Sequence, residues 1–405
     1  MNMTQLLDSK PINVLFILNS LCVGGAEKQV VSLINRIDTT RHAVSLLYLK
    51  QEDALLGQIE PSSCVDGIRC LGVKRGVEWP AVRELARHMD EKRIDVVVCT
   101  NMYALLYGWL ARRQSHRRKE IKLIEVFHTT EVASRKEQLS MLLYRSLVRR
   151  TELLVYVCNG QATHWQRYGL RPRQEAVIYN GIDTGHFVDV WSGEEKLALR
   201  ARHGFRADDY VVGLCAVMRP EKAHEDLLIA MALLGEKGVG IKCLLIGDGP
   251  ERAFIERRIA ELGLGDHVHI TGFLQDVRAA IAACDVMVLP SRETFSLAAL
   301  EAMALGKPMV MTRIGGAAEQ VREGVDGLLY PAGDTAALAA SLAKLSDRAL
   351  RVTAGSKASA NVRDVFDVSR MVKGYERAFA DLVIGNPVQS SASARFGSTY
   401  AATRR

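Results

Sequence analysis

Short apolar runs alternate with amphipathic helical patterns along most of the chain. The first run, PINVLFILNS, ends in a turn and precedes AEKQVVSLINRI, in which apolar residues recur at helical spacing. Further apolar runs of the first half are AVSLLYL, DVVVCT, KLIEVFH and LLVYVC. Strands that alternate with helices in this way predict a parallel sheet with helices on both faces. We therefore expect the first half to form an α/β domain.

The second half repeats this architecture after a polar, charged stretch, VWSGEEKLALRARHGFRADD. Its apolar runs are YVVGLCAV, IKCLLIGDG, HVHITGF, DVMVLP and KPMVMT, and helical patterns such as HEDLLIAMALLGEKG separate them. Two doubly wound domains leave a cleft between them, and in such sheets ligands bind beyond the carboxyl ends of the strands. Polar functional residues are therefore expected at those strand ends.

The chain of 405 residues is long enough for two domains, and its end, NPVQSSASARFGSTYAATRR, has the polar, small-residue composition of a disordered tail. The predicted boundaries are 1–10 for an N-terminal extension, 11–185 for a Rossmann-like first domain, 186–208 for a linker, 209–365 for a Rossmann-like second domain, 366–386 for a helix that packs back toward the first domain, and 387–405 for the tail. We assign no catalytic role to the tail.

Composition and cysteine usage indicate an ordinary soluble protein. Apolar residues make up 48% of the chain and charged residues 24%. The 8 cysteines occur singly, without a C-x-x-C pair, which favours buried free thiols in a reducing compartment and no metal site. The start, MNMTQLLDSK, lacks a signal pattern, and no run approaches the ~18 apolar residues that span a bilayer. We expect a cytoplasmic protein.

The net charge of +7 lies entirely in the first half, because residues 1–184 hold 26 Lys and Arg against 19 Asp and Glu, whereas residues 185–405 hold 27 of each. Two segments, ARRQSHRRKE and YRSLVRR, concentrate the cations Arg112, Arg113, Arg117, Arg118, Lys119, Arg145, Arg149 and Arg150. One interpretation is peripheral contact with anionic lipid on the inner face of the plasma membrane, where each cation contributes about 1 kcal/mol. The other is a solvated loop that keeps the protein soluble. No stacking aromatic residues are interleaved with these cations, so no nucleic-acid partner is expected.

Two acidic residues stand out in SRETFSLAALEAMALGKPMV, residues 291–310. Glu293 follows the strand DVMVLP, and the helix expected to begin near Thr294 would leave its first backbone N–H groups free, which attracts anions. These N–H groups belong to Phe295, Ser296 and Leu297. Glu301 lies about 12 Å farther along a helix, so the two carboxylates could flank an anion. A turn residue and a half-exposed helical residue are the alternative.

Cationic residues and glycines follow other predicted strands. Arg219 and Lys222 lie in RPEKAHEDLL, where they could neutralise a diphosphate leaving group. No carboxylate pair such as D-x-D follows a strand, so no divalent metal ion is expected. Gly249 in IGDGPER and Gly24 and Gly25 in VGGAEK permit close backbone approach to a ligand, although tight turns alone would also explain them.

Together the motifs resemble those of glycosyltransferase family 4, the glycosyl transferases group 1, over nearly the whole chain. They are VGGAEK, YNGIDTGHF, RPEKAHEDLL, IGDGPER, ITGF, SRETFSLAALEAMALGKPMV and IGGAAEQV, in the family's order. The resemblance implies the GT-B fold, in which two Rossmann-like doubly wound α/β domains face each other across a cleft. It also implies a retaining enzyme that moves a sugar from a nucleoside diphosphate sugar to a glycan or lipid-linked glycan acceptor, in cell-surface polysaccharide biosynthesis and without a metal.

The resemblance further implies roles for single residues of the second domain. Glu293 would face hydroxyls of the donor sugar, and Glu301 would bind the ribose hydroxyls of the nucleotide. Lys222 and a nearby arginine would hold the diphosphate, together with the backbone N–H groups of residues 295–297. The nucleoside diphosphate would leave from the face that the acceptor hydroxyl attacks, and it would take the proton of that hydroxyl, so no protein base is needed.

Three residues of the first domain are also matched by the resemblance. His128, in IEVFHTT, matches a histidine that reaches the donor sugar from the other domain. Gly24 and Gly25 match the loop that lines the cleft beside donor and acceptor. The choice of base, sugar and acceptor would depend on loops of the cleft, especially VKRGVEW and TNMYALLYGW, and the sequence does not specify it.

The sequence departs from the family pattern in the loop of Lys222. The family's G-R-L reads Ala216, Val217 and Met218 here, and the arginine follows as Arg219. The glycine that often follows the lysine is Ala223, which could change the turn. These departures give weight to an inactive nucleotide-sugar-binding protein, and the presence of Glu293, Lys222, Glu301 and His128 argues against it. A sugar-nucleotide 2-epimerase of the same fold also stays open, but the ordered motifs fit the transferases better.

Overall fold

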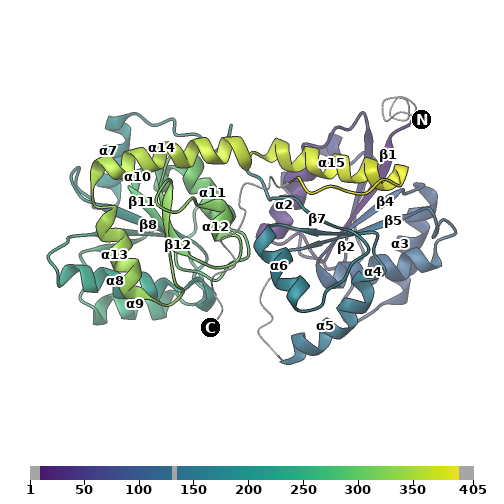
Figure 1. The fold of residues 1–405 in the computed structure, drawn as a ribbon, viewed down its shortest axis with the longest axis horizontal. Coiled ribbons are helices and arrows are strands. Elements are labelled where there is room, and N and C mark those ends of the chain that lie inside the picture. The colour runs from purple at the N-terminus through teal and green to yellow at the C-terminus, as the bar shows by residue number, and fades with distance from the viewer. Residues whose placement is uncertain (1–9, 130–134, 392–405) are drawn as a thin grey trace. The chain divides into compact units, whose positions relative to one another are not determined.

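The computed structural model describes residues 10–129 and 135–391, and the chain forms two compact units (Figure 1). One unit holds the residues up to Gly181 and those from Val368 onward, and the other runs from Ile182 to Asp367. Each unit contains one sheet whose paired strands are parallel, with helices in most of the connections. The prediction of two doubly wound α/β domains is confirmed.

The strands of the first unit are β1 (Ile12–Leu18), β2 (His42–Tyr48), β3 (Ile68–Cys70), β4 (Val96–Thr100), β5 (Lys122–Phe127), β6 (Leu153–Tyr156) and β7 (Glu175–Val177). Its helices are α2 (Gly25–Ile34), α3 (Trp79–Glu91), α4 (Asn101–Gln114), α5 (Arg135–Val148), α6 (Asn159–Arg167) and α15 (Val368–Ile384). The sheet has the order β3-β2-β1-β4-β5-β6-β7, so the direction of winding reverses between β1 and β4. These two strands are apolar runs buried on both faces, as parallel strands require.

Helices close both faces of the first sheet. Gly108 lets α4 lie directly against one face, because a Cβ there would come within 2.5 Å of Cys99 Sγ. On the other face α15 buries Phe379 against Phe16 of β1, with the ring centroids 6.4 Å apart. Helix α15, the last one among the described residues, therefore completes the core of the first unit.

Residues 386–391 continue from α15 along the edge strand β7. Val177 N donates to Ser390 Oγ at 2.8 Å, and Ser391 N donates to Val177 O at 3.1 Å. Val388 N donates to Gln174 Oε1 at 2.8 Å. The prediction of a disordered tail from residue 387 is therefore wrong for 387–391, because these residues find hydrogen-bond partners at an open sheet edge. The predicted tail beyond 391 and most of the N-terminal extension lie outside the described residues.

The strands of the second unit are β8 (Val211–Cys215), β9 (Lys242–Ile246), β10 (Val268–Ile270), β11 (Val286–Leu289), β12 (Met309–Thr312) and β13 (Gly327–Tyr330). Its helices are α7 (Gly193–Arg202), α8 (His224–Gly235), α9 (Arg252–Glu261), α10 (Arg278–Ala283), α11 (Leu297–Ala304), α12 (Ala317–Gln320), α13 (Thr335–Lys344) and α14 (Arg348–Val365), and a short 3₁₀ helix, η3 (Pro220–Lys222), follows β8. The order β10-β9-β8-β11-β12-β13 reverses between β8 and β11. Across the described part of the chain, no helix combines the length and the apolar character needed to cross a bilayer.

The stretch predicted as a linker, 186–208, contains helix α7. Ser192 and Glu195 cap its start reciprocally: Glu195 N donates to Ser192 Oγ at 3.2 Å, and Ser192 N donates to Glu195 Oε2 at 2.7 Å. Arg200 in its last turn lies 2.8 Å from Asp285. This helix therefore belongs to the second unit, and the boundary between the units falls after Gly181.

Candidate functional site

The reversal of the second sheet brings Lys222 and Glu293 together. Lys222 ends η3, which follows β8, and Glu293 follows β11. Lys222 Nζ lies 2.5 Å from Glu293 Oε1, and each side chain is 23% exposed. The pair lies beyond the carboxyl ends of the two strands that flank the reversal, which is where doubly wound sheets bind ligands. It presents one cation and one carboxylate to solvent at this place.

Hydrogen bonds from neighbouring segments hold the loop that carries Glu293. Ser291 Oγ donates to Glu293 Oε1 at 2.9 Å, and Thr312 Oγ1 on β12 donates to Ser291 O at 2.5 Å. Gly316 N donates to Thr294 O at 2.7 Å. The orientation of the carboxylate therefore depends on β12 and the segment after it.

Gly315 permits the close contact between these two segments. Its φ is +55°, in the left-handed region that glycine reaches without strain. A Cβ at this position would lie 2.5 Å from Glu293 O and 2.6 Å from Thr294 O. The motif IGGAAEQV thus contributes a glycine on which the backbone of the Glu293 loop rests.

The loop of Lys222 is held by its own turn and by the Glu293 loop. Ala223 adopts the left-handed conformation that glycine favours, with φ 49° and ψ 44°, and α8 begins at the next residue. Arg292 N donates to Glu221 O at 3.3 Å, which ties the two loops together. His224 is buried directly after this turn, and burial, with the charge of Lys222, lowers the pKa of His224 to about 4. The imidazole is therefore neutral near pH 7 and adds no charge beside the ion pair.

The start of α11 differs from its prediction. The helix begins at Leu297, and the Oγ of its N-cap residue, Ser296, accepts from Ala299 N at 3.3 Å. Ser296 N donates to Gln320 Oε1 at 3.1 Å, so the expectation that this N–H group is free for an anion is wrong. The physical reason is burial, because a backbone amide without water needs a partner inside the protein. Phe295 is also buried, whereas Leu297 is half-buried.

The other predicted residues of the second unit have different environments. Glu301 is half-buried on α11, and Arg219 is exposed, its carbonyl accepting from Lys222 N at 3.0 Å. A Cβ on Gly249 would lie 2.6 Å from Met218 O, so this glycine makes room for backbone rather than for a ligand. Among residues 10–129 and 135–391, no three His, Cys, Asp or Glu side chains gather closely enough to hold a metal ion.

His128 follows β5 in the first unit, and its backbone is held on both sides. Gln161 Nε2 donates to Phe127 O at 2.8 Å and to Thr129 O at 3.1 Å. Trp165 Nε1 donates to Thr129 O at 2.7 Å. Burial lowers the pKa of His128 to about 4, so its ring is neutral near pH 7 and can donate one hydrogen bond and accept another.

Gly24 and Gly25 form the start of α2 after β1. Gly24 is the N-cap residue in extended conformation, and a Cβ there would collide with the carboxylate of Glu27. That carboxylate therefore lies at the start of its own helix, and burial raises the pKa of Glu27. The Glu27 side chain is flexible and could move aside, so this contact does not by itself require glycine at position 24, and a contact with donor or acceptor stays a prediction.

Both units are similar to known proteins. The family model for glycosyl transferases group 1 matches residues 195–360, and the model for Glycosyltransferase Family 4 matches residues 23–186. EpsD of Bacillus subtilis, which is named as a glycosyltransferase, is 30% identical over 271 residues, or 65% of this chain and 70% of EpsD. The chain belongs to glycosyltransferase family 4.

Other relatives of this family 4 glycosyltransferase cover most of its length. N-acetyl-alpha-D-glucosaminyl L-malate synthase of Bacillus anthracis is 27% identical over 68% of this chain and 71% of its own. The crystal structure of HepE from Anabaena in complex with UDP matches with a TM-score of 0.80 at 25% identity, covering 91% of this chain and 100% of HepE. Sucrose-phosphate synthase of Thermosynechococcus elongatus matches with a TM-score of 0.76 at 20% identity, over 93% and 100% of the two chains. The glycosyltransferase therefore has the two-domain GT-B fold.

Within the second domain of the glycosyltransferase, several predicted residues share one sheet edge. Lys222, Glu293 and the start of α11 all lie beyond the carboxyl ends of β8 and β11. Phe273 follows β10 at the same edge and is 76% exposed, which the motif ITGF did not reveal. His128, Gly24 and Gly25 belong to the first domain, after β5 and β1, and their roles toward the donor stay predictions.

Three polar residues that the sequence did not single out lie at the reversal of the first sheet. Asn19 Oδ1, Thr100 Oγ1 and Asn101 Oδ1 are buried and have no hydrogen-bond partner among the described residues. Asn19 follows β1, whereas Thr100 and Asn101 lie where β4 passes into α4, and Asn101 has a φ of 70°. Buried polar atoms without partners and strained backbone gather at functional sites of proteins. The polar pair in TNMYALLYGW, directly after an apolar strand, was the available signal.

The stretch VKRGVEW, one of the two predicted cleft loops, is hydrogen-bonded to α4. Tyr107 OH donates to Gly76 O at 2.9 Å and accepts from Glu78 N at 2.8 Å. Tyr103 OH also donates to Gly76 O. The prediction of a loop at TNMYALLYGW is therefore wrong, because this stretch forms the end of β4 and the first turns of α4, and the helix holds VKRGVEW through these hydrogen bonds.

Proposed function

We propose that this glycosyltransferase moves a sugar, with retention of configuration, from a nucleoside diphosphate sugar to a glycan or lipid-linked glycan in cell-surface polysaccharide biosynthesis. The ion pair of Lys222 and Glu293 carries the proposal, because it places a cation and a hydroxyl-binding carboxylate 2.5 Å apart at a strand-order reversal. The complex of HepE with UDP, at 25% identity, makes uridine diphosphate sugars the first donors to test. The cell-surface role rests on the family resemblance.

The second domain would hold the donor through its phosphates and its sugar. Lys222 neutralises the charge that develops on the leaving diphosphate, a task for which preorganised cations are effective. Glu293 accepts hydrogen bonds from sugar hydroxyls, and Glu301 accepts them from the ribose. The N–H group of Leu297, at the first position of α11, adds a donor for a phosphate oxygen. Side-chain cations do this work in the proposal, which includes no metal ion.

The acceptor hydroxyl would attack the anomeric carbon on the face from which the nucleoside diphosphate departs. A phosphate oxygen of the leaving group takes the hydroxyl proton, so the rate depends on positioning and charge stabilisation. His128, with a pKa lowered to about 4, donates a hydrogen bond to a sugar hydroxyl as a neutral ring and is not a base. Asn19, Thr100 and Asn101, whose buried oxygens lack partners in the described chain, would bind acceptor hydroxyls.

A panel of uridine, guanosine and adenosine diphosphate sugars tests the proposed function. We expect sugars of one base to raise the unfolding midpoint, because a ligand at 100 times its Kd stabilises the fold by about 2.7 kcal/mol. The same donor should be hydrolysed slowly without acceptor, and NMR should show the free sugar first in the anomeric form of the donor. A product epimerised at carbon 2 would instead identify an epimerase. Binding without hydrolysis or transfer under any condition would identify an inactive binding protein.

We also propose that the first domain contacts anionic lipid through a cluster of arginines around Trp109. The cluster comprises Trp109, Arg112, Arg113, Arg118, Arg150 and Arg173. The guanidinium groups of Arg113 and Arg150 lie 5.0 and 5.8 Å from the Trp109 ring centroid. Glu152 pairs with Arg112 and Arg173 of this cluster, so Arg113, Arg118 and Arg150 carry the charge that no carboxylate of the described residues binds. An amphipathic ring among cations suits the boundary between lipid headgroups and water.

Co-sedimentation with liposomes tests the membrane proposal. The double variant Arg113→Ala/Arg118→Ala should bind vesicles that contain phosphatidylglycerol about 30-fold more weakly, because each cation near the surface contributes about 1 kcal/mol. As a control, Arg83→Ala/Arg87→Ala removes two exposed arginines from α3 of the same domain and should change nothing. Equal binding of the wild type to neutral and anionic vesicles would remove the membrane proposal.

A further inference from the structure

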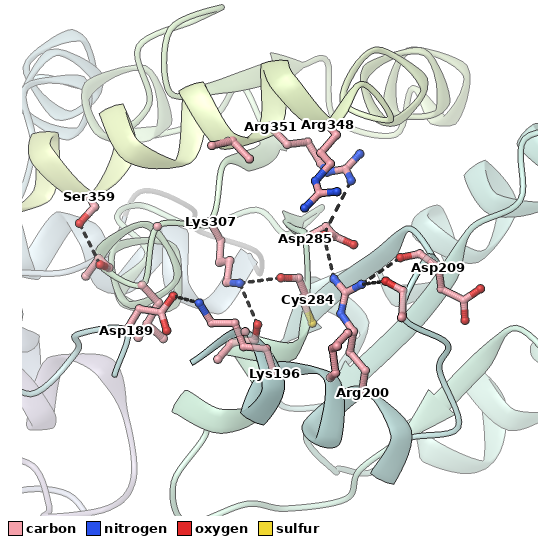
Figure 2. A pocket seen from close by; sticks show the side chains of 18 of the residues that line it. Asp189, Lys196, Arg200, Asp209, Cys284, Asp285, Lys307, Arg348, Arg351 and Ser359 are labelled. Atoms are coloured by element: carbon pink, nitrogen blue, oxygen red, sulfur yellow. Dashed lines mark hydrogen bonds and ion pairs between the residues drawn. The ribbon is translucent and has the colours of Figure 1, made fainter. Parts of the chain in front are cut away.

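A hollow lies at the amino ends of the strands of the second sheet, on the edge opposite Lys222 and Glu293. Figure 2 shows the side chains that line it. Its walls come from α7, the end of α10, the turn between α11 and β12, and α14. Asp285 directly precedes β11, and Lys307 lies just before β12. Every residue of the lining belongs to the second domain, and the hollow is separate from the proposed donor site.

Lys307 brings a buried positive charge to this hollow. Its side chain is nine-tenths buried, and Nζ donates to Ala282 O at 2.8 Å and to Cys284 O at 2.7 Å. An ammonium group has three N–H donors, so these two carbonyls leave one donor unassigned. In the described chain no carboxylate forms an ion pair with Lys307, and burial lowers its pKa. The charge of Lys307 is therefore poorly compensated by the protein itself.

Close backbone packing fixes the position of Lys307. A Cβ on Gly355 of α14 would collide with Gly306 O, so the turn before Lys307 rests on the helix without an intervening side chain. Ser359 Oγ, one turn later on α14, donates to Ala304 O at 3.0 Å. Figure 2 shows the Lys307 side chain extending from this turn into the hollow.

The carboxylates nearest to Lys307 form ion pairs with other cations. Asp189 Oδ2 lies 2.5 Å from Lys196 Nζ. Asp285 Oδ1 lies 2.8 Å from Arg200 Nη2 and 3.8 Å from Arg351 Nη2, so one carboxylate serves two arginines. The lining includes the cations Lys196, Arg200, Lys307, Arg348, Arg351 and Arg363 and the acids Asp189, Asp208, Asp209 and Asp285. Positive charge exceeds negative charge by two.

The rim of the hollow has cations that are open to a ligand. Arg348 and Arg363 are exposed on α14, and neither forms an ion pair with a carboxylate of the described residues. Asp208 and Asp209 also line the hollow, and in the described part of the chain neither forms an ion pair with Arg348 or Arg363.

We propose that this hollow binds a small phosphate-bearing metabolite, whose phosphate dianion contacts Lys307, Lys196 and Arg348. The two excess positive charges of the lining match the charge of a phosphate monoester near pH 7. Hydrogen bonds from ammonium and guanidinium groups to phosphate are charge-assisted and stronger than neutral ones. The unassigned N–H group of Lys307 gains its acceptor in this way.

Thermal unfolding of the full chain with inorganic phosphate, and separately with glucose 6-phosphate, tests the site. Sodium chloride at equal ionic strength and free glucose serve as controls. We expect a saturable rise of the unfolding temperature midpoint. Inorganic phosphate produces this rise if the free anion is enough for binding, and only glucose 6-phosphate produces it if the sugar is also needed. Arg348→Ala should weaken this binding about tenfold, the effect of one charge-assisted hydrogen bond. Arg257→Ala, an exposed arginine of α9 in the same domain, should leave the response unchanged.

Further variants separate this hollow from the donor site. The phosphate response should persist in Lys222→Ala, and binding of the nucleotide sugar should persist in Arg348→Ala. Lys307→Met should abolish the phosphate response. If this substitution of a buried residue prevents folding, the double variant Lys196→Ala/Arg348→Ala tests the same loss. A midpoint shift no larger than that of sodium chloride, an equal loss in Arg257→Ala, or a loss confined to Lys222→Ala would overturn the proposal.

Discussion

Replacing Lys222 with alanine should lower kcat for sugar transfer by about 10²–10³-fold while the fold stays intact. The proposed task of the ammonium is to meet charge that develops as the glycosidic bond to phosphate breaks, so the loss falls on kcat more than on KM. Lys222 lies outside the hydrophobic core of its domain and its side chain pairs with Glu293, so its truncation removes no core packing. Steady-state rates with the active donor, together with circular dichroism, measure both effects.

Two controls separate charge stabilisation from a structural role of Lys222. Lys237→Ala removes the same charge from the exposed segment after α8 and should leave kcat unchanged. If Lys222 served only to neutralise Glu293, the double variant Lys222→Met/Glu293→Gln would be more active than Lys222→Met. We expect no such recovery, because the leaving diphosphate still lacks its cation. Near-normal turnover of Lys222→Ala, or recovery in the double variant, would refute the assigned role.

The strands were predictable because the central strands of a parallel sheet are apolar runs bounded by turns. Strands β1 and β4 lie within the runs PINVLFILNS and DVVVCT and are buried along nearly their whole length. Helix α7 was missed for the opposite reason, since it buries none of its residues and its charged composition resembles a linker. The local signal was the capping box of Ser192 and Glu195, which depends on two side chains rather than on hydrophobic periodicity.

At the candidate site, the charged residues were predictable from motifs, but their hydrogen bonds were not. Lys222 and Glu293 are 71 positions apart and meet because β8 and β11 are neighbours, an order that apolar runs do not encode. The N–H group of Ser296 was expected to be free, and it is bound by Gln320, 24 positions away. Buried polar groups find such partners through tertiary packing, so a local pattern identifies the helix start without showing which of its donors remain free.

Replacing Gly315 with alanine should lower kcat/KM about 10²-fold, because a displacement of about 1 Å at a catalytic group has an effect of this size. The added Cβ would lie 2.5 Å from Glu293 O and 2.6 Å from Thr294 O, and these are backbone atoms that cannot move aside without shifting the Glu293 loop. The free energy of unfolding should fall by about 2–3 kcal/mol, from the left-handed φ and the overpacking together. Transfer kinetics and urea unfolding measure the two quantities.

Gly263→Ala is the matched control for this substitution. Gly263 has a φ of +65° in the same domain, but a Cβ there meets no atom within 4 Å. The free energy of unfolding of this variant should fall by only about 1 kcal/mol, the cost of the left-handed φ, and its kcat/KM should not change. Equal losses of activity in both variants would show that general destabilisation, rather than displacement of Glu293, is the cause. A loss of kcat/KM that occurs only in Gly315→Ala, and that stabilising ligands of the second domain do not restore, would place the effect in the Glu293 loop. The backbone after β12 supports that loop directly.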